Sequence, residues 1–222
     1  MSLDLSVYLV TDADGCGAYG VERTVEEAIA GGASFVQLRD KHADDAAMIQ
    51  QARRLKLSLD QHAARTGHRV PLIINDRLRV ARESGADGLH VGQSDTAVRD
   101  ARRVLGADAI LGLSINNREQ LAGAPLELLD YIGLGPVFAT PSKADHAAPI
   151  GLDGLASLVN ACPLPAVAIG GIKAEHVEAV RHSGARGMAV VSAICGQASP
   201  RQAADRLAAR WRQAPGPALT AE

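Results

Sequence analysis

The chain has few aromatic residues, no excess of positive charge and no long hydrophobic run. Aromatic residues make up 3% of its 222 residues, which argues against a surface that stacks on nucleic-acid bases. The formal net charge is -2 at pH 7, so no overall attraction draws the chain to nucleic acid or to an anionic membrane. No apolar segment approaches the length of a membrane-spanning helix, about 20 residues. We therefore expect no nucleic-acid partner and no membrane partner.

Cysteine is also scarce, and the cysteines that occur are far apart. Cys16, Cys162 and Cys195 are odd in number and lack the paired spacing of a metal site. Reduced thiols in a cytosolic protein are the simplest explanation. The N-terminus shows no basic region followed by a long apolar run, so we expect no secretory signal. The composition, 47% hydrophobic and 22% charged, is typical of a globular protein with a substantial core. These features predict a cytoplasmic protein.

Short apolar runs alternate with amphipathic segments along the whole chain. Most of the runs are almost continuously hydrophobic, which is typical of parallel strands covered on their outer face. The runs are residues 7–11, 35–39, 70–75, 88–92, 109–114, 131–137, 166–170 and 187–191. Helical patterns lie between and after them, among others at residues 24–30, 44–65, 96–105, 174–182 and 200–212. The alternation predicts a succession of strand–helix units.

Small-residue turns separate several helices from the next strand. Turns of this kind begin at Gly31, Gly85, Gly106 and Gly184, and glycine suits the left-handed position that ends a helix. Eight strand–helix units predict an α/β fold, a single (β/α)8 TIM barrel over residues 1–222 with its core at about 6–212. An open doubly wound sheet is the alternative, but no Gly-x-Gly-x-x-Gly follows the first strand.

Polar and charged side chains end the second apolar run, in Gln37-Leu38-Arg39-Asp40-Lys41. Side chains alternate along a strand, so Val36 and Leu38 would pack outward while Gln37 and Arg39 point inward, with Lys41 just beyond. Two cations and an amide in a barrel interior are costly unless an anionic, polar ligand lies there. A strand whose charged end simply reaches solvent is the alternative.

Two other runs end in a carboxylate, at Asp76 and at Asp95. A hard cation such as Mg²⁺ is usually held by one or two carboxylates together with substrate phosphate oxygens. Each aspartate could instead cap the helix that follows it. Because both lie at neighbouring strand ends beside Arg39 and Lys41, the pair favours a magnesium site.

The longest irregular stretch covers residues 139–152, and such a loop in a compact domain is usually functional. Thr140, Ser142 and Lys143 could close over an anionic ligand, or could belong to a solvated surface loop. After the seventh run comes Gly170-Gly171, and Ser192 ends the eighth. Main-chain N–H groups at these places form the usual phosphate site of such barrels, although two glycines also suit a tight turn.

Other polar residues carry weaker signals. Ser114 and Asn116 follow the fifth run and could bind a ligand or cap the next helix. His90 lies within a run and is more typical of a satisfied core residue than of a catalyst. No Ser/His/Asp order and no Cys/His pair stands out.

The sequence thus predicts two anion-binding subsites. One combines Arg39, Lys41 and Lys143 with Mg²⁺, and the other combines the main-chain N–H groups at Gly170-Gly171 and Ser192. Together they predict a group transfer in which a diphosphate leaves and a phosphate anchors the second substrate.

In combination, these motifs resemble the thiamine phosphate synthase family, and they occur in the expected order over nearly the whole chain. They are Gln-x-Arg-x-Lys from Gln37, Asn75-Asp76, Gly-Gln-x-Asp ending at Asp95, residues 140–143 and Ile-Gly-Gly ending at Gly171. The resemblance implies a transferase that joins an aminopyrimidine methyl diphosphate to a thiazole phosphate, with Mg²⁺ as cofactor and a largely dissociative mechanism. Its products would be thiamine phosphate and diphosphate.

The resemblance also implies roles for individual residues. Asp76 and Asp95 would bind Mg²⁺, and the catalytic residues would be Arg39, Lys41, Ser114 and Lys143. Residues of the pyrimidine diphosphate site would be Gln37, Arg39, Lys41, Asn75, Ser114 and Lys143. Residues of the thiazole phosphate site would be Thr140, Ser142, Gly171, Val191 and Ser192. Leu38, Asp40 and Pro141 belong to the same motifs and are expected to contact substrate as well.

Two alternatives to a thiamine phosphate synthase remain. The related thiazole tautomerases carry a histidine in the Ser-x-x motif after strand five, where this chain has Ser114-Ile115-Asn116, and asparagine cannot act as a general acid or base. A barrel that only binds phosphorylated metabolites would not need both aspartates. The partners expected are small-molecule substrates, and a homo-oligomer formed through the outer helices is left open.

Overall fold

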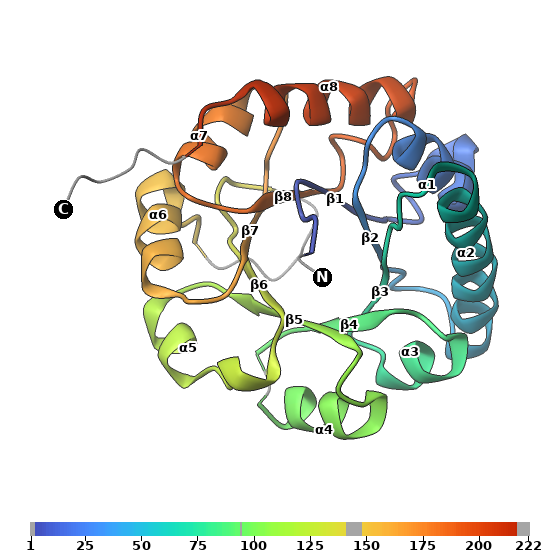
Figure 1. The fold of residues 1–222 in the computed structure, drawn as a ribbon, viewed down its shortest axis with the longest axis horizontal. Helices are drawn as coiled ribbons and strands as arrows, with labels where there is room; N and C mark the ends of the chain where they lie inside the picture. The colour runs from blue at the N-terminus through green and yellow to red at the C-terminus, as the bar shows by residue number, and fades with distance from the viewer. Residues whose placement is uncertain (1–2, 94, 141–147, 217–222) are drawn as a thin grey trace.

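The computed structural model describes residues 3–93, 95–140 and 148–216, and of residues 95–97 it describes the main chain only. Within these residues, parallel strands pair in sequence order into a closed barrel (Figure 1). The strands are β1 Val7–Val10, β2 Phe35–Leu38, β3 Leu72–Asn75, β4 Gly88–Val91, β5 Ile110–Ile115, β6 Tyr131–Leu134, β7 Ala166–Ile169 and β8 Gly187–Val190. Each lies on its predicted run, except that β5 extends one residue beyond the run at 109–114. The pairing of β1 with β8 excludes the open sheet. The predicted barrel is confirmed.

Helices form a ring around the barrel, and α8 lies beside α1 to complete it (Figure 1). The helices are α1 Gly20–Ala30, α2 Asp45–Thr66, α3 Leu78–Ser84, α4 Asp95–Leu105, α5 Arg118–Gly123, α6 Gly151–Ala161, α7 Val177–His182 and α8 Pro200–Gln213. Side-chain oxygens cap several N-termini: Asp44 accepts from the Ala47 N–H and Ser199 from the Gln202 N–H. Among the described residues, no helix combines the length and apolarity that crossing a membrane requires.

The alternation of side chains along the strands divides the core into two layers. Outward-facing residues such as Val36 and Leu38 pack under the helices, as predicted. Inward-facing residues fill the barrel, where the rings of Tyr8, Phe35 and Tyr131 meet edge to face with centroids 4.7 to 5.9 Å apart. Half of the six aromatic residues of the chain therefore lie inside the barrel.

The glycines predicted to end helices follow the expectation in three of four cases. Gly85, Gly106 and Gly184 have φ values of 74°, 87° and 88°. The expectation is wrong for Gly31, whose φ is -90°, and Gly32 takes the positive φ instead. A Cβ atom on Gly31 would lie 2.2 Å from the main-chain oxygen of Arg201, so glycine is needed there for the close approach of α8.

Candidate active site

A cavity of about 590 Å³ opens where the carboxyl ends of the strands converge, the place where barrels of this kind carry their sites. Many of the residues predicted from the sequence line it. They are Gln37, Arg39, Asn75, Ser114, Thr140, Gly171, Val191 and Ser192. The closed barrel therefore brings residues from β2, β3, β5, β7 and β8, and from the segment after β6, into one space.

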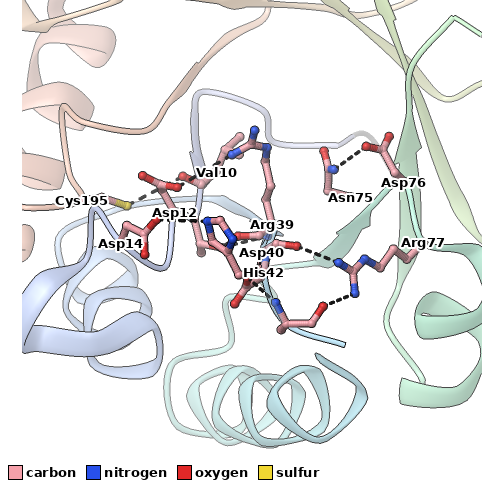
Figure 2. Close-up of polar contacts among 12 residues, drawn as sticks. Val10, Asp12, Asp14, Arg39, Asp40, His42, Asn75, Asp76, Arg77 and Cys195 are labelled. Atoms are coloured by element: carbon pink, nitrogen blue, oxygen red, sulfur yellow. Dashed lines mark hydrogen bonds and ion pairs between the residues drawn. The ribbon is translucent and has the colours of Figure 1, made fainter. Parts of the chain in front are cut away.

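Arg39 extends from the end of β2 and is only 8% exposed. Thr11, just beyond β1, fixes the main chain there: its hydroxyl accepts from the Arg39 N–H at 2.9 Å and donates to the Arg39 carbonyl at 3.2 Å. The guanidinium Nη1 lies 3.9 Å from the Asp12 carboxylate (Figure 2). Because the cation is buried at the cavity wall, the alternative of a strand end in solvent does not hold for Arg39.

The neighbouring residues of this motif lie elsewhere. The side chain of Leu38 packs in the outer layer, and Lys41 is exposed on the loop after β2. The Asp40 carboxylate accepts from the His42 and Ala43 N–H groups at 2.8 and 2.9 Å. Burial raises the pKa of Asp40, but these N–H groups, together with the nearby side chains of His42 and Arg77, outweigh it, and the pKa falls below its ordinary value. None of the three is among the residues that line the cavity.

Arg77 joins the loop after β2 to the loop after β3, a role that the sequence did not indicate. Its guanidinium donates to the carbonyl oxygen of Asp40 at 3.2 Å (Figure 2). It also donates to the carbonyl oxygen of Ala43 at 2.6 Å and lies 3.3 Å from Asp45. The loop that carries Lys41 is thus attached to the segment that carries Asp76.

Asp76 directly follows β3 and is exposed next to Asn75, which lines the cavity. Its backbone has a φ of 59°, unusual for a residue other than glycine. The Asn75 side-chain amide donates to the Asp76 carboxylate at 2.7 Å, and the Asp76 N–H donates to the His90 carbonyl at 2.8 Å. Arg77 is the N-cap of α3 and makes no side-chain cap. The contacts described here therefore give no support to Asp76 as a helix cap.

Ser114 and His90 form a pair that the sequence did not reveal. Ser114 Oγ lies 2.9 Å from His90 Nε2, and His90 Nδ1 lies 2.9 Å from the Tyr131 hydroxyl. His90 is a buried, satisfied residue, as expected, yet it also lines the cavity. Neither Ser114 nor Asn116 caps α5, because Asn117 does so by accepting from the Gln120 N–H. Asn116 donates instead to the Gly135 carbonyl.

The opposite wall is formed by main chain at the ends of β7 and β8. Gly170 and Gly171 have φ values of 102° and 64°, and Cβ atoms there would meet Pro136 at 2.6 Å and the Ala139 oxygen at 2.7 Å. Glycine is thus needed for the turn and for its packing. Among the described residues, the main-chain hydrogen bonds outside helices and strands include none donated by the N–H groups of Gly171 or Ser192. Such N–H groups at a cavity wall suit an anion.

Some predicted residues fall outside what the structure describes. Pro141, Ser142 and Lys143 belong to the undescribed segment 141–147, and the Asp95 side chain is not described, although the residue begins α4. Among the described residues, no group of three or more His, Cys, Asp or Glu side chains could hold a metal ion. A metal held by Asp76 and Asp95 therefore stays a prediction.

A closed (β/α)8 barrel, with a cavity at the carboxyl ends of its strands that contains charged and polar side chains, defines the chain as a TIM-barrel protein with an enzyme-like site. Residues 7–194 match the family model described as thiamine monophosphate synthase. The thiamine-phosphate synthase of Psychrobacter sp. is 51% identical over 93% of this chain and 95% of its own length. That of Azorhizobium caulinodans is 47% identical over 92% and 93%. The chain belongs to the thiamine monophosphate synthase family.

A solved structure agrees with this assignment. Thiamine phosphate pyrophosphorylase from Pyrococcus furiosus is 29% identical, with a TM-score of 0.83 over 95% of this chain and 97% of that one. The resemblance inferred from the motifs is thereby confirmed, and membership of the family makes the chain a transferase.

Proposed function

We propose that the chain transfers the aminopyrimidine methyl group of 4-amino-2-methyl-5-(diphosphooxymethyl)pyrimidine to a thiazole phosphate, which gives thiamine phosphate and diphosphate. The observation that carries this proposal is the composition of the cavity. It combines the buried Arg39 and the polar Gln37 and Asn75 on the β2–β3 side with the main chain of Gly171 and Ser192 on the β7–β8 side. Two anion-binding walls around one space suit two phosphorylated substrates.

On the first wall, Arg39 would contact the diphosphate, and Gln37, Asn75 and Ser114 would hold the pyrimidine. Lys41 and Lys143 would complete the charge around the diphosphate from their loops. Thr11 fixes the main chain of Arg39 through two hydrogen bonds. The buried guanidinium itself lies 3.9 Å from the Asp12 carboxylate, so it has an anionic neighbour before substrate arrives. A positioned cation stabilises negative charge that develops on a leaving oxygen.

The donor set at the mouth fits a magnesium ion. Asp76 is exposed beside Asn75, and hard carboxylate oxygens together with substrate phosphate oxygens are the ligands that Mg²⁺ prefers. Asp76 and Asp95 would hold the ion. When bound, it would neutralise charge on the departing diphosphate.

On the second wall, the N–H groups of Gly171 and Ser192 would bind the thiazole phosphate, with Thr140, Ser142 and Val191 beside it. The acceptor ring would then lie across the cavity from the pyrimidine. The reaction then needs aligned rings and an anionic leaving group held in place, not a protein nucleophile. That requirement supports a dissociative course in which diphosphate leaves before the thiazole nitrogen bonds to carbon.

The test is diphosphate release by the purified protein from the two substrates together, with and without Mg²⁺. We expect thiamine phosphate and diphosphate in equal amounts and dependence on Mg²⁺. A thiazole tautomerase would alter the thiazole without releasing diphosphate, and a binding protein would release none. Arg39→Ala should lose most activity. Arg54→Ala, which removes an exposed pair with Glu22, is the matched control and should keep it. The cytoplasmic setting and a homo-oligomer stay predictions.

A further inference from the structure

A continuous chain of hydrogen bonds crosses the barrel interior, and all of its residues line the cavity. It joins side chains from five different strands through four contacts. Gln37 Nε2 donates to the Tyr8 hydroxyl at 2.6 Å, and that hydroxyl lies 2.8 Å from the Tyr131 hydroxyl. Tyr131 in turn lies 2.9 Å from His90 Nδ1, and His90 Nε2 lies 2.9 Å from Ser114 Oγ. We call these five residues the interior relay.

The first donor sets the direction of the interior relay. Distance alone leaves the donor open in the contacts Tyr8–Tyr131, Tyr131–His90 and His90–Ser114. The amide donation of Gln37 to Tyr8 is the basis on which the Tyr8 proton is assigned to Tyr131. Tyr131 then directs its own proton to His90 Nδ1. A neutral imidazole that accepts at Nδ1 carries its proton on Nε2 and donates there to Ser114 Oγ. The single proton of the Ser114 hydroxyl is then directed into the cavity that Ser114 lines.

The barrel makes room for the interior relay at a specific place. A Cβ atom on Gly112 would lie 2.2 Å from Tyr131 Cζ and 2.5 Å from His90 Nδ1. Glycine in the middle of β5 is therefore what allows the tyrosine and the histidine to meet. Burial also raises the pKa of both Tyr8 and Tyr131, so both phenols keep the protons that they donate.

We propose that Gln37, Tyr8 and Tyr131 are positioning residues that hold His90 as the neutral Nε2–H tautomer, so that Ser114 serves as a hydrogen-bond donor to the pyrimidine diphosphate. This inference rests on the proposed function. It assigns a use to His90 and the two tyrosines, which the substrate-binding motifs do not include. Gln37 also lines the cavity, and because its Nε2 donates to Tyr8, its side-chain carbonyl oxygen remains to accept from the amino group of the pyrimidine.

The direction of the interior relay also decides what the Ser–His pair can do. In a nucleophilic pair, the histidine accepts the serine proton at an unprotonated nitrogen. In the assigned direction, Nε2 carries the proton that it donates to Ser114, and Nδ1 accepts from the Tyr131 phenol. The pair is thus arranged to orient a neutral hydroxyl, and no covalent intermediate on Ser114 is expected.

The tautomer of His90 is measurable in the free enzyme by nitrogen-15 NMR, with the His90 signals assigned by their loss in His90→Gln. We expect Nδ1 to give the signal of an unprotonated nitrogen and Nε2 that of a protonated one. Tyr131→Phe removes the donor to Nδ1, so it should change the tautomer and lower kcat at least about tenfold. KM for the pyrimidine diphosphate should change less. Tyr8→Phe should change the His90 tautomer and kcat in the same direction, and it is the second variant to test if Tyr131→Phe does not fold.

The third tyrosine provides the control. Tyr19 bonds to the Ala198 carbonyl at 3.3 Å and does not line the cavity, so Tyr19→Phe should leave the His90 tautomer and kcat unchanged. A wild-type protein with the proton on Nδ1 would overturn the proposal, as would a folded Tyr131→Phe with an unchanged tautomer or unchanged kcat. Failure of the proposed function looks different, because the wild-type enzyme itself would then release no diphosphate.

Discussion

The side-chain amide of Asn75 donates a hydrogen bond of 2.7 Å to the carboxylate of the next residue, Asp76 (Figure 2). Successive side chains on a strand point to opposite faces and do not normally meet. They meet here because Asp76 has left the strand with a φ of 59°. One carboxylate oxygen accepts from Asn75, a residue that lines the cavity, and a hydrogen bond of this kind fixes the orientation of a carboxylate.

Two substitutions of Asp76 separate the effect of its charge from the effect of its backbone conformation. Asp76→Asn removes the charge but tolerates a positive φ, so the free energy of unfolding should change by less than about 0.5 kcal/mol. Asp76→Ala should cost about 1 kcal/mol, because alanine is strained at that φ. Both variants should raise the Mg²⁺ concentration for half-maximal activity. Mg²⁺ titrations and urea unfolding measure the two effects, and an unchanged Mg²⁺ requirement would remove Asp76 from the metal site.

Asp95 is the second predicted ligand. Asp95→Ala should raise the Mg²⁺ requirement about tenfold or more, since even residues that only support metal ligands have effects of that size. The same titration checks it, with diphosphate release as the signal. A normal Mg²⁺ dependence together with lower stability would leave Asp95 as a cap at the start of α4.

Lys143 should matter for turnover and little for folding. Lys143→Ala removes a cation expected to contact the diphosphate, so kcat should fall by a larger factor than the equilibrium constant for unfolding changes. Steady-state kinetics and urea unfolding of the same preparation supply the comparison. Lys173→Ala, at an exposed lysine outside the cavity lining, should leave both unchanged. Equal kcat in the two variants would exclude Lys143 from the mechanism.

Asp40 is expected to stabilise the loop after β2. Asp40→Ala leaves the His42 and Ala43 N–H groups without their acceptor and should cost about 1 kcal/mol. Asp40→Asn keeps an acceptor oxygen and should cost less. Because folding lowers the pKa of Asp40, the stabilisation is complete above the ordinary pKa of aspartate and disappears as the pH falls through the lower, folded value. Urea unfolding at several pH values would show the gap between wild type and Asp40→Ala narrowing in acid, and a constant gap would contradict this.

The buried thiols of Cys16 and Cys195 should titrate as a pair. The neighbouring Cys195 thiol lowers the pKa of Cys16, against the opposing effect of burial, while the pKa of Cys195 is raised. Cys195→Ala removes that thiol and should move the Cys16 titration to higher pH. The ultraviolet absorbance of the thiolate follows it. Cys162→Ala is the control, since burial raises the pKa of Cys162 and no thiolate is expected there near neutral pH.

The sequence determined the barrel and much of one wall of its site. Periodicity depends only on neighbours along the chain, so eight apolar runs predicted the strands, and alternation placed Gln37 and Arg39 inward and Leu38 outward. The same local logic predicted glycine at the ends of helices. It was wrong at Gly31, where the decisive contact comes from Arg201 on a helix at the other end of the chain.

Only the tertiary structure decided which inward-facing residues meet. Tyr8 and Tyr131 are 123 positions apart and share a hydrogen bond, while His90 meets Ser114 across 24 positions. No local pattern encodes these pairs, because they depend on how the strands are staggered when β1 closes on β8 and on the space that Gly112 leaves. The sequence alone predicts on which face of a strand each side chain lies. Only the closed barrel determines which other side chains it contacts there.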